Sequence, residues 1–248
     1  MGEAIVFTSG KGGVGKTTTV ANVGVGLSLL DKKVIMLDTD MGLRNLDVVM
    51  GLEDQINYNL MDVLQNKCRL TQAIIQDKRY PNLYFIPASL NSNNICDYKQ
   101  AFELLIEHLK MEFDYCLIDC PAGMDSGFEF AIAGADNAIV VTTPHISAVK
   151  DAKRIIDNLH TNHIQNIHIV INEYNRFLVM KQNMLSEKDI LDFLGEECLG
   201  LVPFDNKVII SQNRGIPVLE LRSGAGRKLY KLAQSFAKTI KEECSYEV

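Results

Sequence analysis

The feature that most limits the fold of this chain is a glycine-rich loop at residues 10–18, directly after the apolar run Ala4–Phe7. The loop reads Gly10, Lys11, Gly12, Gly13, Val14, Gly15, Lys16, Thr17 and Thr18, which matches the pattern G-x-x-x-x-G-K-[ST] in full. Glycines let a backbone wrap a phosphate chain closely, because some of these positions need a positive φ that disfavours a side chain. Backbone N–H groups and the start of the next helix then direct partial positive charge at the phosphates. The sequence therefore predicts a strand, a phosphate-binding loop and a helix in succession.

Two side chains of this loop have roles that the pattern itself assigns. Lys16 neutralises the β- and γ-phosphates of a nucleotide, and the Thr17 hydroxyl is placed to ligate Mg²⁺. The pattern does not require the other cation, Lys11. It is either an exposed loop lysine, which is common for this residue type, or a charge supplied to the nucleotide of a second subunit, as an arginine finger is.

Short apolar runs alternate with helix-period segments along the rest of the chain, which is typical of βαβ units around a parallel sheet. We expect strands at 4–8, 34–38, 83–87, 115–119, 138–143, 167–172 and 199–202, and helices at 17–30, 60–65, 98–110, 147–160, 187–194 and 226–241. The predicted fold is α/β: a single P-loop NTPase domain over residues 1–248, with a mostly parallel twisted sheet and helices on both faces. Residues 89–95 are expected to form a mobile surface loop.

Composition limits the function classes. The chain has 248 residues, 47% of them apolar, enough for one sizeable core. Its net charge of −6 argues against non-specific nucleic-acid binding. No apolar run is long enough to span a membrane and the first residues lack a signal-peptide pattern, so a cytoplasmic location is expected. None of the six cysteines forms a C-x-x-C pair, and Cys116 and Cys120 are expected to pack in the core on one face of a strand.

Carboxylates that end two buried strands complete the candidate site. Asp119 ends the run 115–119 and can hold Mg²⁺ through its bound water. Gly123, shortly after it, is typical of a loop whose backbone senses the γ-phosphate. Asp40 follows the second strand and could orient the attacking water, although residue type alone makes it equally a turn or cap residue.

The string Lys11–Thr18 resembles the deviant Walker A box of the ParA/MinD class of ATPases. In that class the first lysine marks an ATP-sandwich dimer. The strings Gly42–Asp47, Asn82–Ser89 and Cys120–Gly123 resemble the MinD branch of the class, and the likeness extends from Ile5 to about Lys241.

The resemblance implies an Mg²⁺-dependent ATPase in which Lys11, Lys16 and Asp40 act in catalysis. Asp40 then corresponds to the family's water-positioning switch residue and contributes to the metal site with Thr17 and Asp119. The resemblance also implies that Asn172, Pro203 and Asp205 flank the base. The chain lacks the N/T-K-x-D segment of guanine-binding proteins after its sixth strand, which favours adenine and hence ATP.

Members of this family end in a basic amphipathic helix that forms on lipid. Here residues 226–241 carry an apolar stripe flanked by lysines. A membrane-surface helix would also look like this, but alignment with the family predicts the last core helix. The stripe is made by Leu229, Leu232, Ala233, Phe236, Ala237 and Ile240. The predicted tail at 242–248 carries three acids, which an anionic leaflet would repel. Peripheral contact with the cytoplasmic face of the membrane, direct or through a partner, therefore stays open.

The function implied by the resemblance is an ATP-dependent dimerisation switch. It would hydrolyse ATP, regulate placement of the division septum and cycle between the cytosol and the inner membrane face. The implied partners are a second copy, an inhibitor of septum assembly and an activator of hydrolysis, with no nucleic acid. Two alternatives remain: a ParA-type partition ATPase, which would bind DNA, and a MinD-like regulator of flagellar number.

Overall fold

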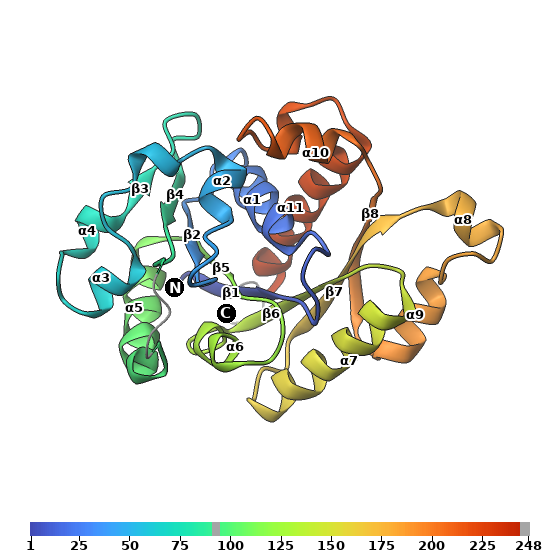
Figure 1. Cartoon of the computed structure of the whole chain (residues 1–248), viewed down its shortest axis with the longest axis horizontal. Helices are drawn as coiled ribbons and strands as arrows, with labels where there is room; N and C mark the ends of the chain where they lie inside the picture. Colours follow the sequence, from blue (N-terminus) through green and yellow to red (C-terminus); the bar gives the residue numbers. More distant parts are fainter. Residues whose placement is uncertain (91–94, 244–248) are drawn as a thin grey trace.

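The computed structural model describes residues 1–90 and 95–243 and is built around one twisted sheet (Figure 1). Within these residues the sheet has eight strands: β1 (Glu3–Thr8), β2 (Val34–Asp38), β3 (Ile75–Gln76), β4 (Leu83–Ile86), β5 (Tyr115–Asp119), β6 (Asn137–Thr142), β7 (Ile167–Tyr174) and β8 (Glu197–Pro203). Their order across the sheet is β3-β4-β2-β5-β1-β6-β7-β8. Neighbouring strands are parallel, apart from the short β3, which is antiparallel to β4. The predicted α/β class is confirmed.

Helices cover both faces of this sheet. The α-helices are α1 (Lys16–Ser28), α2 (Leu46–Met50), α3 (Leu60–Leu64), α4 (Leu70–Ala73), α5 (Lys99–Glu112), α6 (Ser126–Ala131), α7 (Ile146–Thr161), α8 (Arg176–Met180), α9 (Glu187–Leu194), α10 (Lys207–Gln212) and α11 (Gly224–Glu243). In the part of the chain that the structure describes, three short 3₁₀ turns accompany them: η1 (Glu53–Gln55), η2 (Ile95–Tyr98) and η3 (Val218–Glu220). Helices α1 and α11 pack on one face, and α5, α6, α7 and α9 pack on the other.

Alternation along β1 explains why this strand reads as a continuous apolar run. Ile5 and Phe7 enter the core beneath α1 and α11, whereas Ala4 and Val6 enter the core on the opposite face. Successive side chains of a strand point to opposite faces, so a strand covered on both sides is apolar at every position. Cys116 and Cys120 lie in the same core cluster, as predicted from their spacing.

The elements that the sequence pattern missed are short. They are β3 and the helices α2, α4, α6, α8 and α10, none longer than six residues. Such segments are too short to show a helical or strand period. Two predicted boundaries differ from the structure: η2 already contains Ile95, at the end of the predicted loop, and α11 extends through Glu243, into the predicted tail. Residues 91–94 of that loop and 244–248 of that tail lie outside the described residues.

The last helix is a core helix over its described side chains, as predicted. Leu229, Leu232, Ala233 and Phe236 are buried against α1 and β8. The side chain of Ile240 lies outside those described. Among the residues that the structure describes, no helix combines the length and apolar character needed to cross a bilayer.

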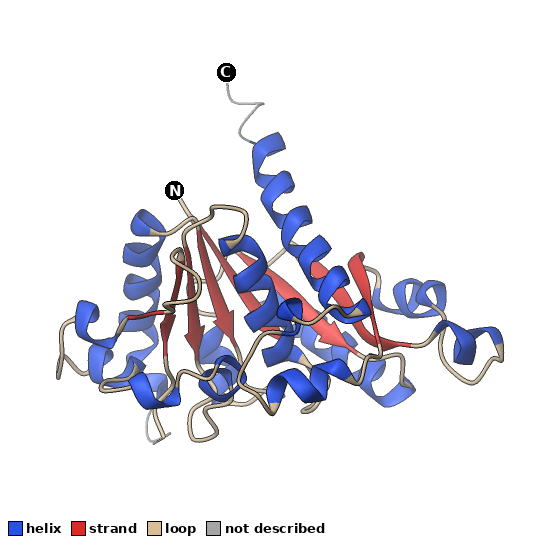
Figure 2. Cartoon of the chain, turned by 90° about the horizontal axis from the view of Figure 1, so that it is seen from above, coloured by secondary structure: helices blue, strands red, loops and turns tan. Residues whose placement is uncertain are grey.

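The sheet order puts the phosphate-binding loop at a switch point. The chain leaves β1 for β2 on one side of it, and later crosses from β5 to β6 on its other side. Ligands of open α/β sheets bind at such points, beyond the carboxyl ends of the strands. Figure 2 shows the arrowheads of the long strands pointing to the same edge of the sheet, while α11, the helix before the C-terminus, projects beyond the opposite edge.

Candidate nucleotide-binding site

The loop between β1 and α1 has the backbone that its glycines predict. Gly13 and Gly15 have φ values of 80° and 87°, in the left-handed region. A Cβ on Gly15 would lie 2.1 Å from Nδ2 of Asn172, which donates a hydrogen bond of 2.8 Å to the carbonyl of Val14. A Cβ on Gly12 or Gly13 would meet no described atom within 4 Å. The loop is therefore clamped from β7 on one side and open on the other.

Lys16 and Asp119 form a buried ion pair at the floor of this loop. Lys16 Nζ lies 2.5 Å from Asp119 Oδ1, and the two side chains are 7% and 1% exposed. Burial alone would lower the pKa of Lys16, but the charge and hydrogen bond of Asp119 outweigh it and raise that pKa. The other carboxylate oxygen of Asp119, Oδ2, is buried and has no hydrogen-bond partner among the described residues.

Asp38 is a second buried carboxylate at this site, and no sequence pattern indicates a role for it. It is the register partner of Asp119 across β2 and β5. Burial, reinforced by the negative charge of Asp119, raises the pKa of Asp38 to about 8. Its two oxygens accept hydrogen bonds from the backbone N–H groups of Asp40, at 2.9 Å, and Leu46, at 3.2 Å. Asp38 thus fastens both ends of the loop between β2 and α2.

Asp40 lies on that fastened loop, at the same edge of the sheet as the glycine loop. Its side chain is half-buried, and burial raises its pKa although the nearby Lys16 charge opposes the change. Gly123, in the loop after β5, has a φ of 98° and its backbone N–H donates to the carbonyl of Ser9 at 3.1 Å. The predicted water-positioning and phosphate-sensing loops therefore both adjoin the phosphate-binding loop.

A cavity of about 160 Å³ continues from the glycine loop toward β8. Its lining includes the three residues expected near the base, Asn172, Pro203 and Asp205, together with Gly13, Gly15, Thr18, Thr19, Glu173, Val202, Phe204, Val208, Ile209, Gln212 and Leu229. No sequence pattern indicates Gln212, because its contact joins residues far apart in the chain: its Nε2 donates to Thr18 Oγ1 at 2.7 Å.

Asp205, in the wall of this cavity, is held by hydrogen bonds from three backbone groups. Its carboxylate accepts backbone hydrogen bonds from Lys207 at 3.0 Å, Gly224 at 2.8 Å and Ala225 at 3.3 Å. Partial burial opposes ionisation, but these three donors prevail and lower the pKa of Asp205. The carboxylate therefore fixes the loop after β8 to the start of α11 and shapes the cavity through the backbone.

Lys11 lies on the open side of the loop. Its side chain is exposed and makes no salt bridge with any acid in residues 1–90 and 95–243. The preceding Gly10 packs against α7, because a Cβ there would lie 2.5 Å from the backbone of Asp151. The contact of Gly10 with α7 thus fixes the start of the loop, while the exposed side chain of Lys11 remains able to contact another molecule.

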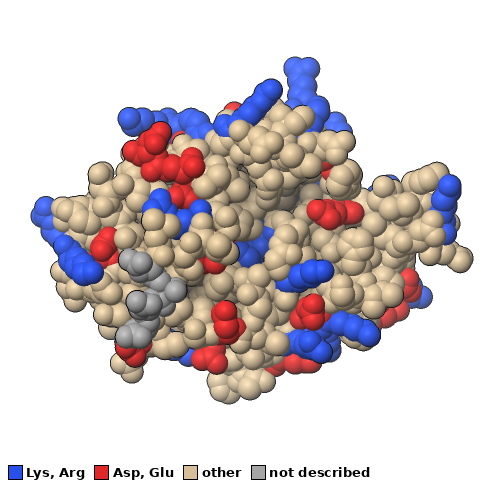
Figure 3. Space-filling model, viewed as in Figure 1, with Lys and Arg blue, Asp and Glu red and all other residues tan. Residues whose placement is uncertain are grey.

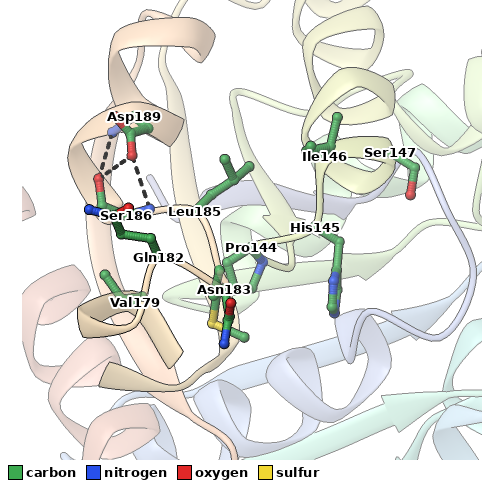
Figure 4. Close-up of a pocket in the computed structure, with 11 residues that line it drawn as sticks. Pro144, His145, Ile146, Ser147, Val179, Gln182, Asn183, Leu185, Ser186 and Asp189 are labelled. Carbon is green, nitrogen blue, oxygen red and sulfur yellow. Dashed lines mark hydrogen bonds between the residues drawn. The ribbon is translucent and has the colours of Figure 1, made fainter. Parts of the chain in front are cut away.

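A second cavity, of about 690 Å³, lies beside the start of α7. Figure 4 shows His145, Ile146 and Ser147 along one side of it, facing the segment that joins α8 to α9. On that segment the Ser186 hydroxyl donates to Asp189 at 2.6 Å in a capping box at the start of α9. These hydrogen bonds satisfy Asp189 within the cap of α9.

Comparisons with known proteins agree on one family. A family profile described as an AAA domain matches residues 2–173. The septum site-determining protein MinD of Bacillus subtilis is 48% identical over 220 residues, covering 88% of this chain and 82% of that protein. The chain belongs to the MinD family. Two solved MinD structures have the same fold. The MinC:MinD cell division protein complex of Aquifex aeolicus has a TM-score of 0.87 and 37% identity, and covers 95% of this chain and 96% of that one.

The second MinD structure, from Pyrococcus horikoshii, is described as complexed with Mg-ADP. It has a TM-score of 0.86 and 29% identity, covering 97% of this chain and 98% of that one. The residues of the present site fit such a ligand. The Cα atoms of Gly12 and Gly13 border open space that phosphates could fill, and the unpartnered Asp119 Oδ2 could accept from metal-bound water. Lys16 supplies the positive charge.

Proposed function

We propose that this MinD-family chain is an Mg²⁺-dependent ATPase whose nucleotide state controls dimerisation and thereby placement of the division septum. The observation that carries the proposal is the buried cluster of Lys16, Asp119 and Asp38 beneath a glycine loop with open backbone faces. The names of the relatives support the cellular role, because the Bacillus subtilis protein is a septum site-determining protein.

The chain's own groups have distinct tasks in hydrolysis. Lys16 and the loop N–H groups bind the phosphates, and Thr17, Asp119 through water, and Asp40 would hold Mg²⁺. The metal, when bound, withdraws charge from the phosphate oxygens. Asp40 orients a water molecule for attack, since its loop is fixed at both ends by Asp38. Orientation of water, rather than strong basicity, is what phosphoryl transfer requires.

A second copy of the chain would cover the carboxyl edge of the sheet. Exposed apolar side chains lie in the loops at this edge: Leu43 after β2, Met124 after β5 and Ile146 at the start of α7. Apolar side chains exposed around a charged site are typical of a protein interface. In such a face-to-face dimer, the exposed Lys11 supplies its charge to the partner's nucleotide.

The partners proposed beyond the second copy are of the Min type. The Aquifex aeolicus complex pairs MinD with MinC, which supports a septum-inhibitor partner of the MinC kind here, and an activator of hydrolysis completes the cycle. Peripheral membrane contact belongs to the same proposal, with ATP as the signal that recruits the dimer.

Sedimentation with liposomes tests this function against its alternatives. Vesicles with an anionic lipid fraction are incubated with the chain and Mg²⁺, with either ATP or ADP, and DNA binding is measured in parallel. The septum function predicts co-sedimentation with ATP only, and no DNA binding at moderate salt. ATP-dependent DNA binding with a steep salt dependence would instead favour the partition function.

A further inference from the structure

A groove distinct from the two cavities above lies between α8 and the first turns of α11. Its volume is about 590 Å³, and β8 forms its base. In Figure 1 β8 lies between α8 and α11, and residues from these three elements line the groove. Arg176 comes from α8, and Arg227, Lys228 and Lys231 come from α11. Four cations from two separate helices thus converge on one concave surface.

The charges of these four side chains are uncompensated within the part of the chain that the structure describes. None of them forms a salt bridge with a described acid, and the described lining of the groove includes no Asp or Glu. Arg227 and Lys231 are four residues apart on one helix, an arrangement of like charges that destabilises the helix. Figure 3 shows Lys and Arg side chains along the upper edge and at both ends of this face of the molecule, with acidic side chains among them. The chain as a whole carries a net charge of −6. Against this background, a local cluster of four cations attracts an anionic ligand to this place on the surface.

The floor of the groove is apolar, so a ligand that fits it should carry apolar groups as well as negative charges. Leu201 and Pro203 lie at its base, and the rings of Phe177 and Phe204 are 61% and 56% exposed at its sides. A duplex phosphate backbone would use the cations and leave this floor uncovered. A polypeptide that carries both carboxylates and apolar side chains matches both parts of the groove.

We propose that this groove binds an acidic peptide segment of another protein, with an apolar side chain seated between Phe177 and Phe204 and carboxylates paired with Arg176, Lys228 and Lys231. The groove shares Pro203 and Phe204 with the wall of the nucleotide cavity. A ligand in the groove would therefore contact the loop beside the expected base site. The binding itself does not depend on the ATPase proposed above, and it is tested without nucleotide.

The test uses fluorescence anisotropy with the full chain and a short labelled peptide made of glutamates with one phenylalanine and one leucine. Lys228→Glu combined with Lys231→Glu reverses two rim charges at exposed helix positions. The matched control combines Lys67→Glu and Lys188→Glu, which change the net charge equally at exposed positions outside the groove. We expect the groove variant to weaken peptide binding by about tenfold or more, the control to change it little, and added salt to weaken it.

Three probes separate the outcomes. The same peptide with glutamine in place of glutamate should bind weakly, and so should a glutamate peptide without the two apolar residues. Equal binding by the groove variant and the control, or no binding of the acidic peptide at millimolar concentration, would overturn the proposal. Tight binding of a single-stranded oligothymidine in place of the peptide would also overturn it and assign the groove to nucleic acid. A cooperative thermal unfolding transition like that of the parent chain shows that both variants fold.

Discussion

The Lys16 ammonium lies 2.5 Å from the Asp119 carboxylate, and both groups are buried beneath the glycine loop. The cation that the phosphate-binding pattern assigns to the nucleotide is therefore also the counter-ion of a buried strand-end carboxylate. Phosphates would bring new negative charge to Lys16, and Mg²⁺ would bring new positive charge to Asp119. We therefore expect the nucleotide and Mg²⁺ to replace this ion pair together, so that the binding of one favours the binding of the other.

Lys16→Ala should abolish ATP binding and also destabilise the fold. Removing one partner of a buried ion pair leaves the other charge uncompensated, at a cost of about 3–5 kcal/mol. Calorimetric titration with ATP and urea unfolding at neutral pH measure the two effects. As a control, Lys16→Met combined with Asp119→Asn should regain much of the stability without regaining ATP affinity. A Lys16→Ala protein as stable as the parent would contradict the energetic role of the pair.

The raised pKa of Asp38 predicts that stability falls as the pH rises toward 8. Its pKa is about 8 in the fold against 3.8 as an ordinary carboxyl, so between these values the folded chain holds a proton that the unfolded chain releases. The unfolded state then binds fewer protons, and the free energy of unfolding decreases with rising pH, by at most about 1.4 kcal/mol per pH unit.

Urea unfolding at a series of pH values between about 5 and 8 measures this slope. Asp38→Asn should flatten it, because the amide does not ionise. The exposed Asp192→Asn serves as the control and should keep the slope of the parent chain. An unchanged slope in Asp38→Asn would mean that another group holds the proton.

The sequence predicted the parts of the site that a local pattern encodes. Gly10–Thr18 is a contiguous motif, and Asp119 and Asp40 follow apolar runs that could be recognised as buried strands. What it could not predict is which strands become neighbours. The order β2-β5-β1 places Asp38 beside Asp119 and brings Asp119 to Lys16, and a parallel sheet with crossovers leaves that order open in the sequence.

The contacts that line the cavity expected to hold the base could not be predicted, for the same reason. Asn172 reaches the glycine loop from β7, and Gln212 reaches Thr18 from a helix of six residues. Family resemblance indicated Asn172, but neither the period nor the residue type of the α10 segment indicated Gln212. The local pattern thus identifies the glycine loop and its lysine, whereas the cavity wall around Gln212 depends on long-range packing.

Lys11→Ala should leave ATP binding intact and prevent the ATP-dependent dimer. The side chain is exposed and makes no described salt bridge, so its removal costs the monomer little stability. Light scattering with a non-hydrolysable ATP analogue and Mg²⁺ measures the oligomeric state. Lys78→Ala removes another exposed lysine and should dimerise like the parent chain. A normal dimer of Lys11→Ala would refute a charge supplied to the partner's nucleotide.

Asp40→Ala should bind ATP and dimerise, yet hydrolyse it roughly 100-fold more slowly, because the attacking water loses the group that orients it. The effect should appear in kcat with a smaller change in KM, since the phosphate contacts of the glycine loop are untouched. Steady-state release of phosphate, with light scattering on the same samples, measures both properties, and Asp54→Ala at an exposed position is the control. Turnover equal to that of the parent chain would remove Asp40 from the mechanism. The fastening of its loop by Asp38 would then serve the metal site or the shape of the dimer face.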